Sequence, residues 1–117
     1  MALLNFQKQF AEAVRSGKKK QTIRAPRKYS IKKGEVLYLY TGLRTKNCKK
    51  LREALCLVAD PVEIYVDKFR INSMDIESLS CDDFAKKDGF SNWTEMIQWF
   101  EKTHGLPFHG QLIMWES

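Results

Sequence analysis

The last apolar segment of the chain, "QLIMW" at residues 111–115, restricts the fold more than any other feature of the sequence. It follows two segments that read as helices, and so short an apolar run is typical of a strand inside a sheet. A buried strand needs neighbouring strands for its backbone hydrogen bonds, so this one must return to strands formed earlier in the chain. We therefore predict an α+β fold, with a small β-barrel as the arrangement that lets the final strand rejoin the sheet.

Both helices that precede this strand carry N-terminal capping signals. Ser80 stands three residues before Asp83, and Asn92 stands three residues before Glu95. At this spacing the first side chain can cap the first turn, and a glycine follows the end of each segment. In the second segment, apolar residues recur at helical spacing and predict a face packed on the core. These residues are Trp93, Met96, Ile97 and Phe100.

The N-terminal part reads as a helix followed by strands. Phe6, Phe10 and Val14 recur every four residues, which predicts a helix over residues 5–16. The following "KKKQTIR" predicts a short strand. Residues 35–42, "EVLYLYTG", alternate between leucines and other side chains and predict a strand with two different faces.

The middle of the chain has weaker signals. Residues 41–54 are polar and basic without a clean period, which predicts a long loop or an irregular hairpin. Two further strand segments are predicted on either side of Pro61, because proline rarely lies inside a sheet. A chain of 117 residues can build one core but not two, so residues 1–117 are predicted to be a single domain.

Several classes of protein are disfavoured by composition. No window approaches the roughly 18 apolar residues of a membrane span, and "MALLNFQKQF" lacks the apolar centre of a signal peptide. The three cysteines contain no C-x-x-C pair, and His104 and His109 lie five residues apart, unlike helical zinc ligands. We predict a cytoplasmic protein without membrane contact, metal or cofactor.

Positive charge is concentrated in one stretch of the chain. From Arg15 to Arg52 there are fourteen Lys or Arg residues and one acid, Glu35, whereas the remainder has six Lys or Arg against thirteen acids. Clustered cations repel one another unless an anionic partner neutralises them, and phosphates do this well. The alternative is a solvated basic surface without a ligand. We favour a nucleic acid or a nucleotide as the partner.

Four short motifs occur in a characteristic order. They are "SGKKKQTIR" at residues 16–24, "IKKGEVLYLYTG" at 31–42, "FAKKDGFSNWTEMIQWF" at 84–100 and "LPFHGQLIMW" at 106–115. In order and spacing, they resemble the ASCH domain family, whose members have a PUA-like β-barrel fold. The resemblance covers nearly the whole chain and implies a single ASCH-like domain with helices flanking the barrel.

The resemblance implies two functions. The family as a whole is regarded as RNA-binding, through a basic cleft beside the barrel. One bacterial branch consists of small amidohydrolases that remove the acyl group from N(4)-acetylcytidine with a lysine, a threonine and a glutamate. By motif, the lysine corresponds to Lys19 and the threonine to Thr22. The glutamate position holds Asp88, which keeps the carboxylate on a side chain one methylene shorter.

These residue types suit amide hydrolysis, which needs a nucleophile, a proton acceptor and a donor for the leaving nitrogen. A lysine that is crowded by other cations and partly withdrawn from water loses its proton more easily, so Lys19 is the candidate base. Thr22 is the candidate nucleophile or water-orienting hydroxyl, and Asp88 is the supporting acid. Because strand residues three apart point to opposite faces, Lys19 and Thr22 converge only if Lys19 lies in the turn before the strand. The alternative for Thr22 is a strand residue without a catalytic role.

The surrounding cations and one aromatic residue are candidates for binding a modified nucleoside or single-stranded RNA. A non-catalytic RNA-binding module would use the same residues to hold phosphates. A ribonuclease with the same basic cleft is a further alternative, although no general acid and base for it can be identified. The candidate binding residues are Lys18, Lys20, Arg24, Arg27, Lys28 and Tyr40.

Overall fold

The computed structural model describes residues 2–76 and 79–116. Within them the chain forms seven strands and three helices, which confirms the predicted α+β class. In chain order they are β1 (Ala2–Phe6), α1 (Lys8–Ser16), β2 (Gln21–Arg24), β3 (Val36–Thr41), β4 (Lys49–Ile64), β5 (Phe69–Ile71), β6 (Met74–Asp75), α2 (Cys81–Lys87), α3 (Trp93–Thr103) and β7 (Phe108–Trp115).

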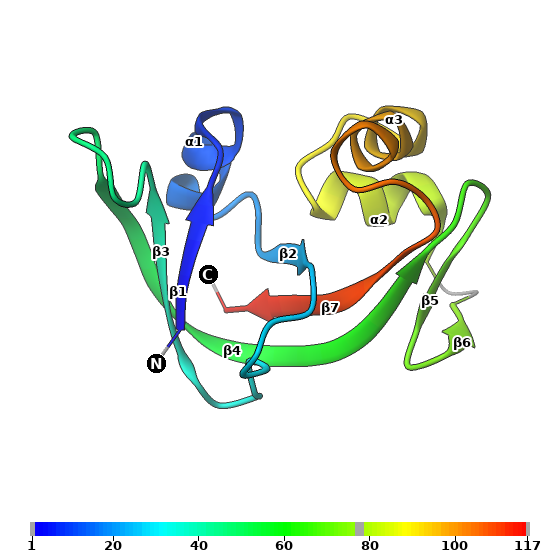
Figure 1. The fold of residues 1–117 in the computed structure, drawn as a ribbon, viewed down its shortest axis with the longest axis horizontal. Coiled ribbons are helices and arrows are strands. Elements are labelled where there is room, and N and C mark those ends of the chain that lie inside the picture. Colours follow the sequence, from blue (N-terminus) through cyan, green and yellow to red (C-terminus); the bar gives the residue numbers. More distant parts are fainter. Residues whose placement is uncertain (1, 77–78, 117) are drawn as a thin grey trace.

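All the strands belong to one strongly curved sheet. Its main path runs β1-β3-β4-β5-β6, and β7 pairs with both β4 and β2. β1 is parallel to β3, whereas the other pairs are antiparallel. The long strand β4 bends beneath the molecule, and the helices lie on the concave side of this bend (Figure 1). α1 lies toward one end of the sheet and the pair α2 and α3 toward the other, with β2 between them.

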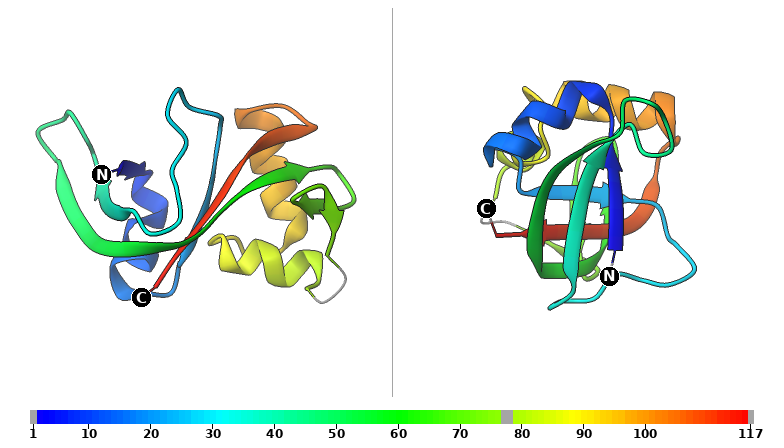
Figure 2. Two further views of the ribbon diagram at one scale, coloured as in Figure 1. Left: turned by 90° about the horizontal axis from the view of Figure 1, so that it is seen from below. Right: turned by 90° about the vertical axis from the view of Figure 1, so that its left-hand side faces the viewer.

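The predicted barrel is not confirmed, because the described strands form an open sheet. β1 and β6 end the main path, and neither pairs with a second strand in the described ranges. Strands β2 and β7 run across the direction of β1 and β3 (Figure 2). The predicted return of the last segment is confirmed, since β7 lies between β2 and β4 in this sheet.

The predicted helix over residues 5–16 begins too early, because Asn5 and Phe6 belong to the strand β1. The helix α1 begins only at Lys8, and it ends at Gly17, whose φ of 87° is left-handed. The four-residue spacing of phenylalanines suggested a longer helix, but residues 2–6 also alternate with a period of two, and pairing with β3 selects the strand. This alternation buries Ala2, Leu4 and Phe6.

The predicted break at Pro61 is also wrong, because β4 continues through it. Pro61 lies opposite Gln111 of β7 and one residue before Val62, which makes the first pair of β4 with β5. Its carbonyl accepts a hydrogen bond from the Asn72 N–H at 3.0 Å. A proline is tolerated here because the sheet uses its carbonyl and does not require an N–H. Of the two alternatives for residues 41–54, the long loop is wrong, because residues 49–54 belong to β4. The irregular hairpin is observed, since β3 and β4 pair antiparallel with a register shift at Leu39/Tyr40.

The two C-terminal helices begin as predicted. The Ser80 hydroxyl accepts from the Asp83 N–H at 3.1 Å, and the Asn92 side chain accepts from the Glu95 N–H at 2.9 Å. Their apolar faces join one core cluster with β5 and β7, while a second cluster fills the curve between β1, β3 and β4. In the part of the chain that the structure describes, no helix is long and apolar enough to cross a membrane.

Candidate active site

The basic segment after α1 turns one of its lysines into the interior. Gly17 ends the helix in a left-handed conformation, and the Lys19 N–H then donates to the Ala13 carbonyl at 2.9 Å. Strand β2 starts only at Gln21. Lys19 therefore lies in the turn before the strand, which meets the condition for its convergence with Thr22.

Lys19 forms a buried ion pair with Asp88, which ends α2. The side chains of Lys19 and Asp88 are 3% and 7% exposed, and Lys19 Nζ lies 3.6 Å from Asp88 Oδ1. The ammonium also donates to the Asp88 backbone carbonyl. Gly89 allows this approach, because its φ is +98° and an added Cβ would lie 3.1 Å from the Phe10 ring and 3.3 Å from Lys19 Cδ.

Gln21 is a buried polar residue that the sequence did not single out. It is 2% exposed, and its Nε2 donates to Asp88 Oδ1 at 3.3 Å. The same carboxylate oxygen thus faces both Gln21 and Lys19. The only signal in the sequence is its position between two candidate residues, because glutamine in a strand is ordinarily read as a solvent-facing residue.

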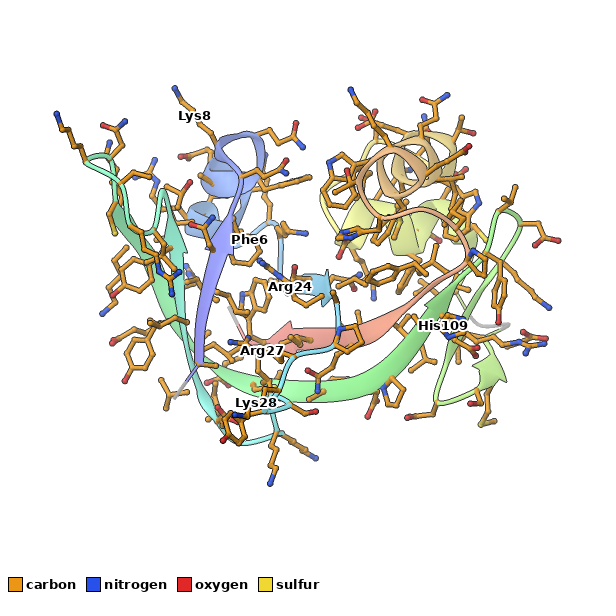
Figure 3. All side chains as sticks on the ribbon, in the orientation of Figure 1. Phe6, Lys8, Arg24, Arg27, Lys28 and His109 are labelled. Atoms are coloured by element: carbon orange, nitrogen blue, oxygen red, sulfur yellow. The ribbon has the colours of Figure 1, made fainter. Side chains whose placement is uncertain are left out.

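Thr22 lies on β2 beside Arg24. The hydroxyl Oγ1 accepts a hydrogen bond from Arg24 Nε at 3.0 Å, which leaves the hydroxyl proton available for another acceptor. The Arg24 guanidinium carbon lies 4.7 Å from the centre of the Phe6 ring, and Figure 3 shows the two side chains close together. This cation–π contact fixes the guanidinium next to the threonine.

The three predicted catalytic residues and Arg24 line one cavity of about 390 Å³. Five aromatic rings complete its walls. Phe10, Phe90 and Trp99 contact one another edge-on or tilted, with ring centres 5.5 to 6.3 Å apart. The aromatic residues of the cavity are Phe6, Phe10, Phe90, Trp99 and His104.

Burial shifts the protonation of the charged residues in the cavity. It lowers the pKa of Lys19, against the attraction of Asp88, and the nearby charge of Arg24 lowers it further. Burial raises the pKa of Asp88, against the attraction of Lys19 and the hydrogen bond from Gln21. The lowered pKa favours the neutral amine of Lys19, and the raised pKa favours the neutral carboxylic acid of Asp88. Burial also lowers the pKa of Arg24 to about 10, so Arg24 remains cationic at neutral pH.

The other predicted binding residues lie outside this cavity. Lys18 and Lys20 are exposed at the surface and do not line it. Of the three cations predicted to crowd Lys19, Arg24 is the one whose charge lowers the Lys19 pKa. Arg27 and Lys28 line a second cavity. Tyr40 is partly buried on β3, on the face opposite the leucines that pack in the core, and it lines neither cavity.

The two histidines lie in different surroundings. His104 packs its ring against Trp99, Phe100 and Phe108, and burial lowers its pKa, so its ring is neutral at neutral pH. His109 Nδ1 lies 3.6 Å from Glu63 Oε2 on the neighbouring strand. Among residues 2–76 and 79–116 no group of three or more His, Cys, Asp or Glu residues is arranged to hold a metal ion.

Comparisons with protein-family models, curated proteins and solved structures found no match to this chain.

Proposed function

We propose that this protein is an amidohydrolase that removes an acyl group from the exocyclic amine of a modified pyrimidine nucleoside such as N(4)-acetylcytidine, and that it is an ASCH-family protein with a PUA-like fold. The observation that carries the proposal is the buried pair of Lys19 and Asp88 on the wall of a cavity that also contains Thr22. Burying an ion pair costs free energy that apolar residues would not cost. Perturbed groups of this kind in a cavity are typical of catalytic sites.

The residues supply each part of the reaction. Hydrolysis adds water across the amide, so the acyl carbon gains an oxygen and the exocyclic nitrogen gains a proton. Neutral Lys19 accepts the proton of the Thr22 hydroxyl, or of a water that Thr22 orients, as the oxygen attacks the acyl carbon. The Arg24 guanidinium stabilises the negative charge that develops. The proton then passes from Lys19 to the leaving amine, with Asp88 stabilising the ammonium in between. If Thr22 itself attacks, the acyl group is left as an ester on its hydroxyl oxygen, and a water that gives a proton to Lys19 cleaves this ester, which releases the acid and restores the hydroxyl.

The cavity suits a planar base. Its volume of about 390 Å³ lies within the roughly 300–1,000 Å³ of small-molecule sites, and its aromatic rings present flat apolar faces. Pyrimidine rings stack on such side chains. The wall thus combines stacking surfaces with the polar groups needed at an exocyclic amide.

A purely RNA-binding role leaves the central feature unexplained. Cations that bind phosphates must reach the ligand, whereas Lys19 is 3% exposed and is held by Asp88. Its burial contributes nothing to phosphate binding. The enzymatic role therefore explains more of the structure.

The direct test is incubation of the purified protein with N(4)-acetylcytidine, with chromatography used to follow cytidine. We expect cytidine and acetate to form in equal amounts at a rate proportional to protein concentration. If cytidine does not rise above the protein-free sample at any pH at which the protein stays folded, the proposal is wrong for this substrate class.

Asp88 provides a second test, since its Oδ1 lies 3.6 Å from Lys19 Nζ, beyond hydrogen-bonding distance. Asp88→Glu adds one methylene and is expected to close this gap and raise kcat a few-fold. Asp88→Asn removes the ionisable group at nearly constant volume and is expected to lower kcat about a hundredfold or more. Steady-state kinetics of both variants measure this. If Asp88→Asn is as active as the parent, the carboxylate has no part in the reaction.

A further inference from the structure

The structure has a second cavity, of about 620 Å³. Both cavities are lined by the same two parts of the chain. The first is lined by the end of β1, at Asn5 and Phe6, and by residues 22–25. The second is lined by the start of β1, at Ala2, and by residues 27–31. The two cavities therefore follow one another along β1.

Cations mark the route from one cavity to the other. Arg24 lies in the first cavity, and Arg27 and Lys28 line the second. In Figure 3 these side chains succeed one another below Phe6. The Cα atoms of residues i and i+4 are at most about 14 Å apart in an extended chain. Arg24 and Lys28 are therefore within reach of one extended ligand. The charge of Arg27 is close enough to Arg24 to contribute to lowering its pKa.

The second cavity also has one acid and one exposed aromatic residue. Glu35 lines it, but the Glu35 Oε1 accepts a hydrogen bond from the Lys32 N–H at 3.1 Å, within its own turn. Tyr29 is 77% exposed, and Lys28 Nζ lies 5.5 Å from the centre of its ring. Cations beside an exposed ring are the groups that hold a phosphate and the base next to it.

We propose that the second cavity binds phosphate groups attached to the acylated nucleoside, so that the substrate is a nucleotide or a nucleotide within an RNA strand. This inference rests on the proposed function for the contents of the first cavity. Arg27 and Lys28 hold the phosphate, and in a strand the neighbouring base stacks on Tyr29. A free nucleoside would leave these cations without a partner in the complex.

The test compares kcat/KM for three substrates: N(4)-acetylcytidine, its 5′-monophosphate, and a tetranucleotide that contains one N(4)-acetylcytidine. We expect at least roughly a tenfold preference for the phosphorylated substrates, decreasing as salt is raised. In Arg27→Ala/Lys28→Ala this preference should fall to about one. The control Lys46→Ala/Lys49→Ala removes the same charge from the exposed hairpin end and should keep it.

The outcomes separate the two proposals. A higher kcat/KM for the tetranucleotide than for the monophosphate identifies an RNA strand as the ligand. Equal kcat/KM for these two substrates identifies a nucleotide. Equal kcat/KM for all three substrates, or a preference that survives in Arg27→Ala/Lys28→Ala, would overturn the phosphate site. If no substrate is hydrolysed, the proposed function fails, and calorimetry then tests the phosphate site alone. Cytidine 5′-monophosphate should bind more tightly than cytidine, and only with Arg27 and Lys28 present; equal binding of the two overturns the inference.

Discussion

Replacing Thr22 by valine is expected to lower kcat for N(4)-acetylcytidine by roughly a thousandfold or more, because loss of one member of a cooperating catalytic set disables the others. Valine keeps the branched shape of a strand residue that is 5% exposed and removes the hydroxyl. The substitution also leaves Arg24 Nε without its acceptor. Steady-state release of cytidine measures the effect.

The matched control is Thr22→Ser, which keeps a hydroxyl beside Arg24 and loses one methyl group. We expect kcat of Thr22→Ser to stay close to that of the parent, in contrast to the large loss in Thr22→Val. Should Thr22→Val turn over substrate as fast as Thr22→Ser, the hydroxyl takes no part in the reaction, and Thr22 is only a buried strand residue.

Replacing the buried ion pair by neutral residues is expected to stabilise the protein. In Lys19→Met/Asp88→Asn, both side chains keep similar lengths, and the two charges that burial disfavours are gone. Replacing a buried ion pair by hydrophobic residues of similar volume is often neutral or stabilising by about 1–4 kcal/mol. Asparagine is polar, but it keeps an oxygen that can accept the hydrogen bond from Gln21. The single variant Lys19→Met leaves Asp88 buried without its counter-charge and is expected to cost about 3–5 kcal/mol at neutral pH. Urea unfolding of the three proteins measures these differences.

The pH dependence of stability follows from the directions of the two shifts. The pKa of Lys19 is lowered in the folded state, so the folded state binds that proton less tightly and gains stability as pH rises toward the unfolded value of about 10.4. The pKa of Asp88 is raised, so the folded state loses stability as pH rises above the unfolded value of about 3.9. At neutral pH, both shifts lower the folding stability of the parent. The double variant lacks both ionisable groups and therefore lacks both losses of stability. Identical pH profiles for the two proteins would contradict these shifts.

Some of the fold was predictable because its signals are local. The side chains of Ser80 and Asn92 cap helices within their own first turns, and a cap needs only neighbouring residues. Asn5, Phe6 and Pro61 were predicted wrongly because their structure depends on distant strands. Pairing with β3 makes the N-terminal residues a strand. Pro61 can stay inside β4 because its carbonyl accepts a hydrogen bond and its missing N–H is not needed.

The site was predictable only in part for the same reason. Lys19, Thr22 and Asp88 were identified through motifs, but Lys19 and Asp88 are 69 residues apart, and their contact depends on how α2 docks beside β2. Gln21 gave no signal, because its role comes from facing Asp88. Trp99 and Thr103 lie four apart on a second face of α3, beside the predicted core face, and this spacing is the signal that could have placed them on the cavity.

If the buried pair of Lys19 and Asp88 serves catalysis at the cost of stability, removing both charges should abolish activity without unfolding the protein. Cytidine release from N(4)-acetylcytidine should be compared between the parent and Lys19→Met/Asp88→Asn, at equal concentrations of protein shown by urea unfolding to be folded. We predict measurable turnover in the parent and none above the protein-free sample in the double variant, although the double variant is at least as stable. Equal rates of cytidine release from the two proteins would contradict a catalytic role for the pair.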